Sequence, residues 1–169
     1  AWDEINKIKQ LICEDNVLSC YPVLLPFVKI IIGNSAADEI KENASRLFPI
    51  NKLLESTDSN NKRKRFYVST VQESISKLSE DSDRFLIITS ELLRDGSGIE
   101  LIKAAKIINR KSTSLLILTH NHKIDITKAF DSGVDALILD ESIDNRSGAL
   151  INALESLKRK SLFLDPALT

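Results

Sequence analysis

The sequence predicts an α/β domain with a doubly wound, five-stranded parallel sheet and helices on both faces. Two observations support this fold class. Apolar runs of strand length alternate along the chain with longer segments of helical period, which is the pattern of a parallel sheet covered by helices. The runs are also short and rich in aliphatic residues, as expected of strands buried on both faces. Right-handed crossovers between such strands give a three-layer domain.

Five apolar runs are the predicted strands. Their Ile, Leu, Val and Phe side chains fit a sheet that is covered on both sides. The predicted strands are residues 29–32, 65–68, 85–88, 115–118 and 136–139.

A predicted helical segment follows each of these strands. In residues 99–109, apolar side chains recur every three or four positions, and Ser97 just ahead of them is a helix cap. In residues 148–160, a leucine stripe is followed by basic residues that complement the negative end of the helix dipole. The predicted helices are residues 37–47, 71–78, 99–109, 124–130 and 148–160.

The chain before this pattern has a different character. Residues 1–28 predict an N-terminal extension, made of an amphipathic helix over residues 3–13 and an extended linker. We expect the helix to pack against its own domain, and docking of a partner is the alternative. Residues 29–160 would form the main domain, and residues 161–169 an exit linker.

Composition and charge exclude several functions. The chain has 169 residues, with 23 Lys and Arg against 24 Asp and Glu and a formal net charge of −1. Binding of a nucleic-acid backbone needs a clustered basic excess, which this balance does not predict. The longest apolar stretch, residues 23–32, contains Pro26 and Lys29 and is shorter than the roughly 18 apolar residues of a membrane span. We therefore expect a cytoplasmic domain without a membrane segment.

The two cysteines, Cys13 and Cys20, have no nearby histidine and no second cysteine pair to complete a tetrahedral metal site. We interpret them as reduced core thiols, with a disulfide or a metal site as the alternatives.

In an open parallel sheet, function belongs at the carboxyl ends of the strands. Two segments next to these ends resemble a known family. LIITSELLRDGSGIELIKAA resembles the third strand, loop and helix of response-regulator receiver domains, and GVDALILDES resembles their fifth strand, particularly in regulators of the LuxR type. The resemblance extends over residues 29–160 and implies a CheY-like fold.

The resemblance also implies a specific site. A working receiver holds Mg²⁺ with two acidic residues after the first strand and the acceptor aspartate after the third, while a hydroxyl and a lysine after the fourth and fifth strands bind the phosphoryl oxygens. In this chain only the hydroxyl position is matched. The site positions fall on Asn34 and Ser35 for the acidic pair, Ser90 for the acceptor, Thr119 for the hydroxyl and Asp140 for the lysine, with Leu137 at the aromatic switch position.

These substitutions predict a pseudo-receiver. Little remains to hold Mg²⁺, and Asp140 would repel an incoming phosphate. We expect a regulatory domain, not an enzyme, with no cofactor and no metal, acting through protein contacts or a ligand at the vacated site. Asp95 is expected to be a turn or capping residue, not a substitute acceptor.

The tail SLFLDPALT resembles the linker through which LuxR-type regulators enter a helix-turn-helix domain. This implies a two-component-type transcription regulator that contacts DNA only through a C-terminal domain absent from this chain. The family also implies a homodimer, and the sequence does not indicate which surface forms the dimer contact.

The same strand ends carry residues that suit two other kinds of chemistry. His120 and His122, with Asp140, would form a metal site, and Ser90 facing either histidine would form an unusual hydrolase site. Gly96-Ser-Gly98 could also bind an anion at the start of a helix, but we expect these residues to form a turn instead.

Overall fold

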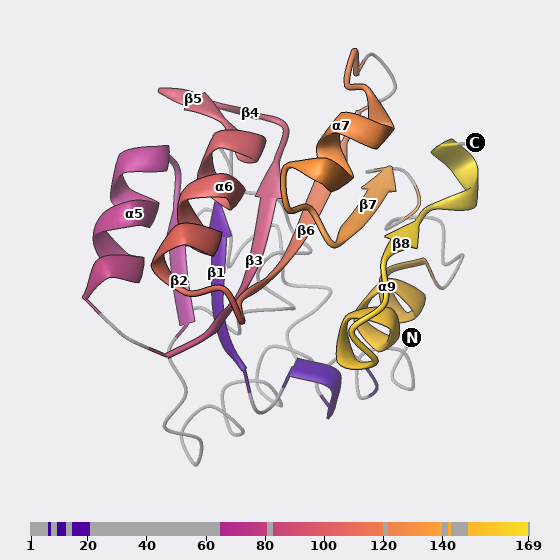
Figure 1. The fold of residues 1–169 in the computed structure, drawn as a ribbon, viewed down its shortest axis with the longest axis horizontal. Coiled ribbons are helices and arrows are strands. Elements are labelled where there is room, and N and C mark those ends of the chain that lie inside the picture. The colour runs from indigo at the N-terminus through magenta and orange to yellow at the C-terminus, as the bar shows by residue number, and fades with distance from the viewer. Residues whose placement is uncertain are drawn as a thin grey trace, which may run out of the picture.

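A computed structural model describes residues 7, 10–12, 15–20, 65–80, 83–119, 122–139, 142 and 149–168 (Figure 1). The strands within these ranges are β1 Asn16–Cys20, β2 Arg65–Val68, β3 Phe85–Ser90, β4 Leu92–Leu93, β5 Gly96–Ser97, β6 Thr113–Leu118, β7 Ala136–Leu139 and β8 Phe163–Leu164. The helices are α5 Val71–Ser79, α6 Gly98–Ile108, α7 Ile126–Asp131 and α9 Ala149–Lys158, with a 3₁₀ turn at Pro166–Leu168.

The main sheet has six parallel strands in the order β2-β1-β3-β6-β7-β8, which confirms the doubly wound α/β class. β4 and β5 form a separate two-stranded hairpin. The predicted strands 65–68 and 136–139 match β2 and β7, whereas β3 and β6 are six residues long, two more than predicted. The polar ends account for the difference, because an apolar run alone does not reveal them; they are Thr89 and Ser90 in β3 and Thr113 and Ser114 in β6.

Two apolar clusters lie on opposite faces of this sheet, because successive side chains of a strand point to opposite sides. In β3, Leu86 and Ile88 belong to the cluster that also contains α9 residues, whereas Phe85 and Ile87 belong to the cluster that contains α5, α6 and α7 residues. The sheet is therefore the middle of three layers (Figure 1).

Polar caps fix where three of the described helices begin. The side chains of Thr70, Ser97 and Asp125 accept hydrogen bonds from backbone amides in the first turns of α5, α6 and α7. The predicted cap at Ser97 is confirmed, with its hydroxyl 3.1 Å from the Glu100 amide. The predicted helix 37–47 lies outside the described residues. None of the described helices has the length and apolarity to cross a membrane.

The first strand differs from the prediction. β1 lies between β2 and β3, with Leu18 opposite Phe66 on one side and Ile87 on the other. The prediction of an extended linker after the N-terminal helix is therefore wrong for Asn16–Cys20, which form the first described strand of the sheet. The predicted strand at residues 29–32 lies outside the described residues. All five β1 residues are buried, including Asn16 and Ser19, and these polar side chains weakened the strand signal.

The helical residues before β1 contact their own domain. Ile12 is buried in the cluster that contains α9, and the Lys7 ammonium lies 2.8 Å from the Glu155 carboxylate of α9. The expectation that this segment packs on its own domain is confirmed for the described residues.

The segment expected to be an exit linker adds the sixth strand. β8 pairs in parallel with β7, with Phe163 opposite Ala136. Asp165, which is 3% exposed, accepts hydrogen bonds from the Leu139 and Ala167 amides, both at 3.0 Å. Residues 163–168 are thus part of the domain, and the boundary expected at residue 160 is wrong.

Candidate functional site

Two of the positions that the resemblance identified, Ser90 and Thr119, lie at the carboxyl ends of the neighbouring strands β3 and β6. Ser90 is the last residue of β3 and lies beside Ile117 of β6. Its half-buried hydroxyl donates a hydrogen bond of 2.9 Å to the Leu92 carbonyl. The Ser90 side chain therefore closes the turn that leaves the strand, and its oxygen is engaged within its own loop.

The loop after Ser90 brings the start of α6 very close to the end of β3. The Gly98 amide, at the start of α6, donates a hydrogen bond of 2.8 Å to the Glu91 carbonyl. A Cβ atom on Gly98 would lie 2.2 Å from the Ser90 carbonyl oxygen. Only glycine permits this approach, which fixes the beginning of α6 against the end of β3.

Asp95 acts as a cap, as predicted. It lies between β4 and β5, and its two carboxylate oxygens accept hydrogen bonds from the Val71 and Gln72 amides at 2.7 and 3.1 Å. These bonds to the first turn of α5 lower the pKa of the Asp95 carboxyl, because they stabilise its charged form. The carboxylate is directed to α5 and does not replace the acceptor.

Cys20 ends β1, directly opposite Thr89 of β3. Its thiol is fully buried and donates a hydrogen bond of 3.5 Å to the Thr70 carbonyl. Burial raises the pKa of this thiol to about 11. Cys20 is a free, buried thiol, as expected, whereas Cys13 lies outside the described residues.

The acidic-pair positions change with the first strand. Asn34 and Ser35 follow the strand predicted at residues 29–32, and both lie outside the described residues. β1 lies between β2 and β3, and this first described strand ends at Cys20, a residue that the resemblance does not assign to the site. The parallel register with β3, which pairs Cys20 with Thr89, is the signal that locates it.

Of the remaining positions, Thr119 lies directly after β6 and Leu137 lies within β7. Thr119 is exposed directly after β6, and its carbonyl accepts a hydrogen bond from the His122 amide at 3.1 Å. Leu137, at the switch position, is fully buried in β7 among the residues that face α6 and α7. Asp140 and His120 lie outside the described residues.

The alternative metal or hydrolase site gains no support from the described part of the chain. In these residues no three His, Cys, Asp or Glu side chains gather as metal ligands would. Ser90 donates to the Leu92 carbonyl, and no hydrogen bond joins its hydroxyl to His122.

Comparisons with known proteins relate this fold to receiver domains. No family model and no curated protein matches the sequence. Among solved structures, a two-component response regulator of the LuxR family from Aurantimonas is 13% identical with a TM-score of 0.58, covering 91% of each chain. The isolated receiver domain of RcsB from Salmonella enterica, determined with a phosphomimetic, is 17% identical with a TM-score of 0.56, covering 92% of this chain and 96% of that one.

A third structure contains RcsB dimers bound to DNA. It is 17% identical with a TM-score of 0.57, and the match covers 92% of this chain and 65% of that longer chain. At these identities the likeness concerns the fold. The parallel sheet, its covering helices and these neighbours together establish that the chain has the fold of response-regulator receiver domains.

Proposed function

We propose that this chain is a pseudo-receiver, a regulatory domain that acts through protein contacts without phosphorylation of an aspartate. The observation that carries the proposal is Ser90 at the carboxyl end of β3, where the resemblance to receiver domains places the acceptor. A serine hydroxyl is a weaker nucleophile and metal ligand than a carboxylate. Here the hydroxyl is also committed to the Leu92 carbonyl.

The end of the first strand supports the same proposal. β1 ends at Cys20, whose thiol is protonated at neutral pH because burial raises its pKa to about 11. The sequence contains no Asp or Glu between Asp15 and Asp38. Mg²⁺ prefers carboxylate oxygens, and none of these residues offers one beside Ser90.

The sequence after β7 adds a charge argument. Asp140, the next residue after Leu139, is acidic where a working receiver needs a lysine to hold the phosphoryl group. A carboxylate there opposes an incoming phosphate. With Ser90 and the missing acidic pair, this leaves Thr119 as the one retained group of the phosphorylation chemistry.

The parent protein, in this proposal, is a LuxR-like transcriptional response regulator. RcsB, which shares the fold, forms dimers on DNA. We propose that this domain likewise forms a homodimer and leaves DNA contact to a domain encoded after Thr169. Because β8 occupies the outer edge of β7, we place the dimer contact on helix surfaces instead of that strand edge.

Phosphorylation by acetyl phosphate with Mg²⁺, followed by intact mass, tests the central claim. We expect no phosphoryl adduct on the wild-type chain or on Ser90→Asp, because the variant restores the acceptor without the metal ligands. The RcsB receiver domain, treated in parallel, shows that the reagent is active. An acid-stable or acid-labile adduct on the wild-type chain contradicts the proposal.

Two further measurements test the regulatory part. Light scattering after size exclusion should give twice the 18.9 kDa chain mass, and a monomer at high concentration contradicts the homodimer. The reading frame beyond Thr169 should encode a helix-turn-helix domain. A frame without one removes the transcriptional assignment and leaves the pseudo-receiver claim intact.

A further inference from the structure

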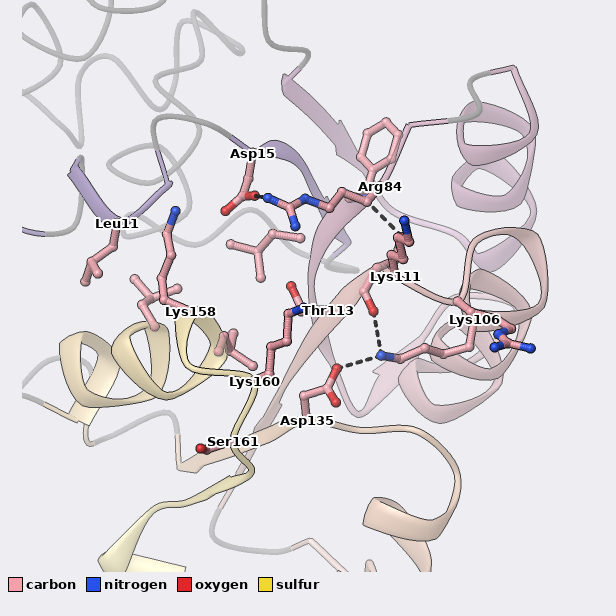
Figure 2. Close-up of a pocket in the computed structure, with 16 residues that line it drawn as sticks. Leu11, Asp15, Arg84, Lys106, Lys111, Thr113, Asp135, Lys158, Lys160 and Ser161 are labelled. Carbon is pink, nitrogen blue, oxygen red and sulfur yellow. Dashed lines mark hydrogen bonds and ion pairs between the residues drawn. The ribbon is translucent and has the colours of Figure 1, made fainter.

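A basic cavity lies at the end of the sheet opposite Ser90. It has a volume of about 500 Å³ and is bordered by the amino ends of β3, β6 and β7 and by the carboxyl ends of α6 and α9 (Figure 2). Leu86, Leu154 and Leu157 form an apolar part of its lining, and Thr113 and Ser161 add hydroxyl groups.

The lining is strongly cationic in a chain whose net charge is −1. Two carboxylates are present, Asp15 and Asp135, which leaves a formal charge of +4 on the lining. The cationic side chains are Arg84, Lys106, Arg110, Lys111, Lys158 and Lys160.

Both carboxylates are already engaged. Asp135 lies 2.7 Å from the Lys106 ammonium and Asp15 lies 3.6 Å from the Arg84 guanidinium (Figure 2). No ion pair within the described ranges involves the other four cations, which are Arg110, Lys111, Lys158 and Lys160. Their charges remain available to a ligand that enters the cavity.

Helix dipoles account for only part of this charge. The carboxyl ends of α6 and α9 each carry roughly half a negative charge, which basic residues in the last turn complement. Two such ends offset about one positive charge, against the +4 of the lining. An excess of about +3 therefore has no structural counterpart in the described cavity wall.

Lys160 gives an independent observation. It follows α9 with a φ of 58°, in the left-handed region, and it is the only described non-glycine residue there. Glycine is the usual residue at this position after a helix, because a side chain there costs about 1 kcal/mol. Lys160 nevertheless adopts this unfavourable backbone conformation, and it lines the basic cavity.

We propose that this cavity binds a small molecule that carries two or more linked phosphates. Lysine and arginine side chains are the usual partners of phosphate oxygens, and several adjacent cations suit linked phosphates better than a single carboxylate. The volume falls within the range of about 300–1,000 Å³ that is typical of small-molecule sites. A concave site of this size in a chain of net charge −1 favours a small anion over duplex DNA.

Isothermal titration of the purified chain with inorganic tripolyphosphate and with ATP tests the proposal. We expect saturable binding of at least one probe, weakening about tenfold or more when NaCl rises from about 50 to about 200 mM. Tighter binding of ATP would identify a nucleotide as the source of the phosphates, and equal binding an inorganic polyphosphate. No heat from either probe at millimolar concentration overturns the proposal.

Charge reversal assigns the binding to the cavity. Lys111→Glu combined with Lys158→Glu should weaken binding by about tenfold or more, because two attractive charges become repulsive. The matched control, Lys123→Glu with Lys128→Glu, changes the net charge equally at exposed residues that do not line the cavity. Equal weakening by both pairs overturns the assignment, as does equally tight binding of a short DNA duplex.

Lys160→Gly tests the binding site with a variant that should not impair folding, in case the charge-reversal variants do. This variant should raise the melting temperature, because glycine relieves the left-handed strain, and should still weaken probe binding by about threefold or more. A stabilised variant with unchanged binding contradicts the role of Lys160 in the site.

Discussion

The Asp95 carboxylate and the Val71 amide are joined by a hydrogen bond of 2.7 Å that links the β4–β5 hairpin to the start of α5. Asp95→Ala should lower the melting temperature, because it removes acceptors from two amides of the first turn. Asp95→Asn is the matched comparison, since it keeps one acceptor and loses the charge. Thermal unfolding followed by circular dichroism measures both variants.

The same hydrogen bond should make the stability of the folded chain depend on pH. The pKa of Asp95 is lowered in the folded chain below its ordinary value of 3.8, so its contribution is fully present above that value. The stability difference between wild type and Asp95→Asn should shrink as the pH falls from 3.8 through the folded pKa. A difference that stays constant down to pH about 2 contradicts this role.

Gly98 should tolerate no side chain. Gly98→Ala would place its Cβ 2.2 Å from the Ser90 carbonyl oxygen and 2.8 Å from the Leu116 side chain. We expect a loss of about 1–3 kcal/mol in the free energy of unfolding, measured in urea. Gly96→Ala is the control, because its nearest contact is the flexible end of Glu100, and it should cost less than about 1 kcal/mol. Equal losses would refute the close-approach explanation.

Asp165 should hold the C-terminal segment on β7. Asp165→Ala leaves the amides of Leu139 and Ala167 without their acceptor, at a cost of about 1–3 kcal/mol. Hydrogen exchange should rise at residues 163–168 and at Leu139 more than in β3. Exchange that rises evenly over the whole sheet would show that Asp165 does not act locally.

Cys20 should be inert in the folded chain. With its pKa raised to about 11, almost none of this thiol is the reactive thiolate at neutral pH. In a Cys13→Ser background, Ellman's reagent should label Cys20 only after unfolding in guanidinium. Rapid labelling of the folded protein at pH about 7.5 would contradict the burial of this side chain.

Sequence pattern was sufficient where strands and helices are locally consistent. β2 and β7 coincide with predicted apolar runs, and α5 and α6 differ from their predicted bounds by one residue at each shifted end. Their apolar stripes, caps and aliphatic runs all specify the same structure, so no tertiary contact was needed to identify them.

Long-range pairing determined what the sequence pattern missed. Asn16–Cys20 is short and contains Asn16 and Ser19, and its place becomes evident only from backbone bonds to β2 and β3. The position of Cys20 beside Thr89, and hence the end of the first strand, follows from that register. Likewise, the tail that resembles a linker contains β8, which pairs with the edge of β7. The Asp165 carboxylate, next to β8, accepts a hydrogen bond from the Leu139 amide of β7.

The basic cavity also could not be identified from the sequence pattern alone. Arg84, Lys111 and Lys158 are far apart in the sequence, and each alone is an ordinary surface charge near the end of a strand or helix. The sequence by itself determined the α/β fold class and the presence of a serine, Ser90, just after the third predicted apolar run, because both follow from local residue types. Only the tertiary structure decided that Asn16–Cys20 pairs with β2 and β3 and which charges share a cavity, because parallel crossovers bring together residues that no local pattern connects.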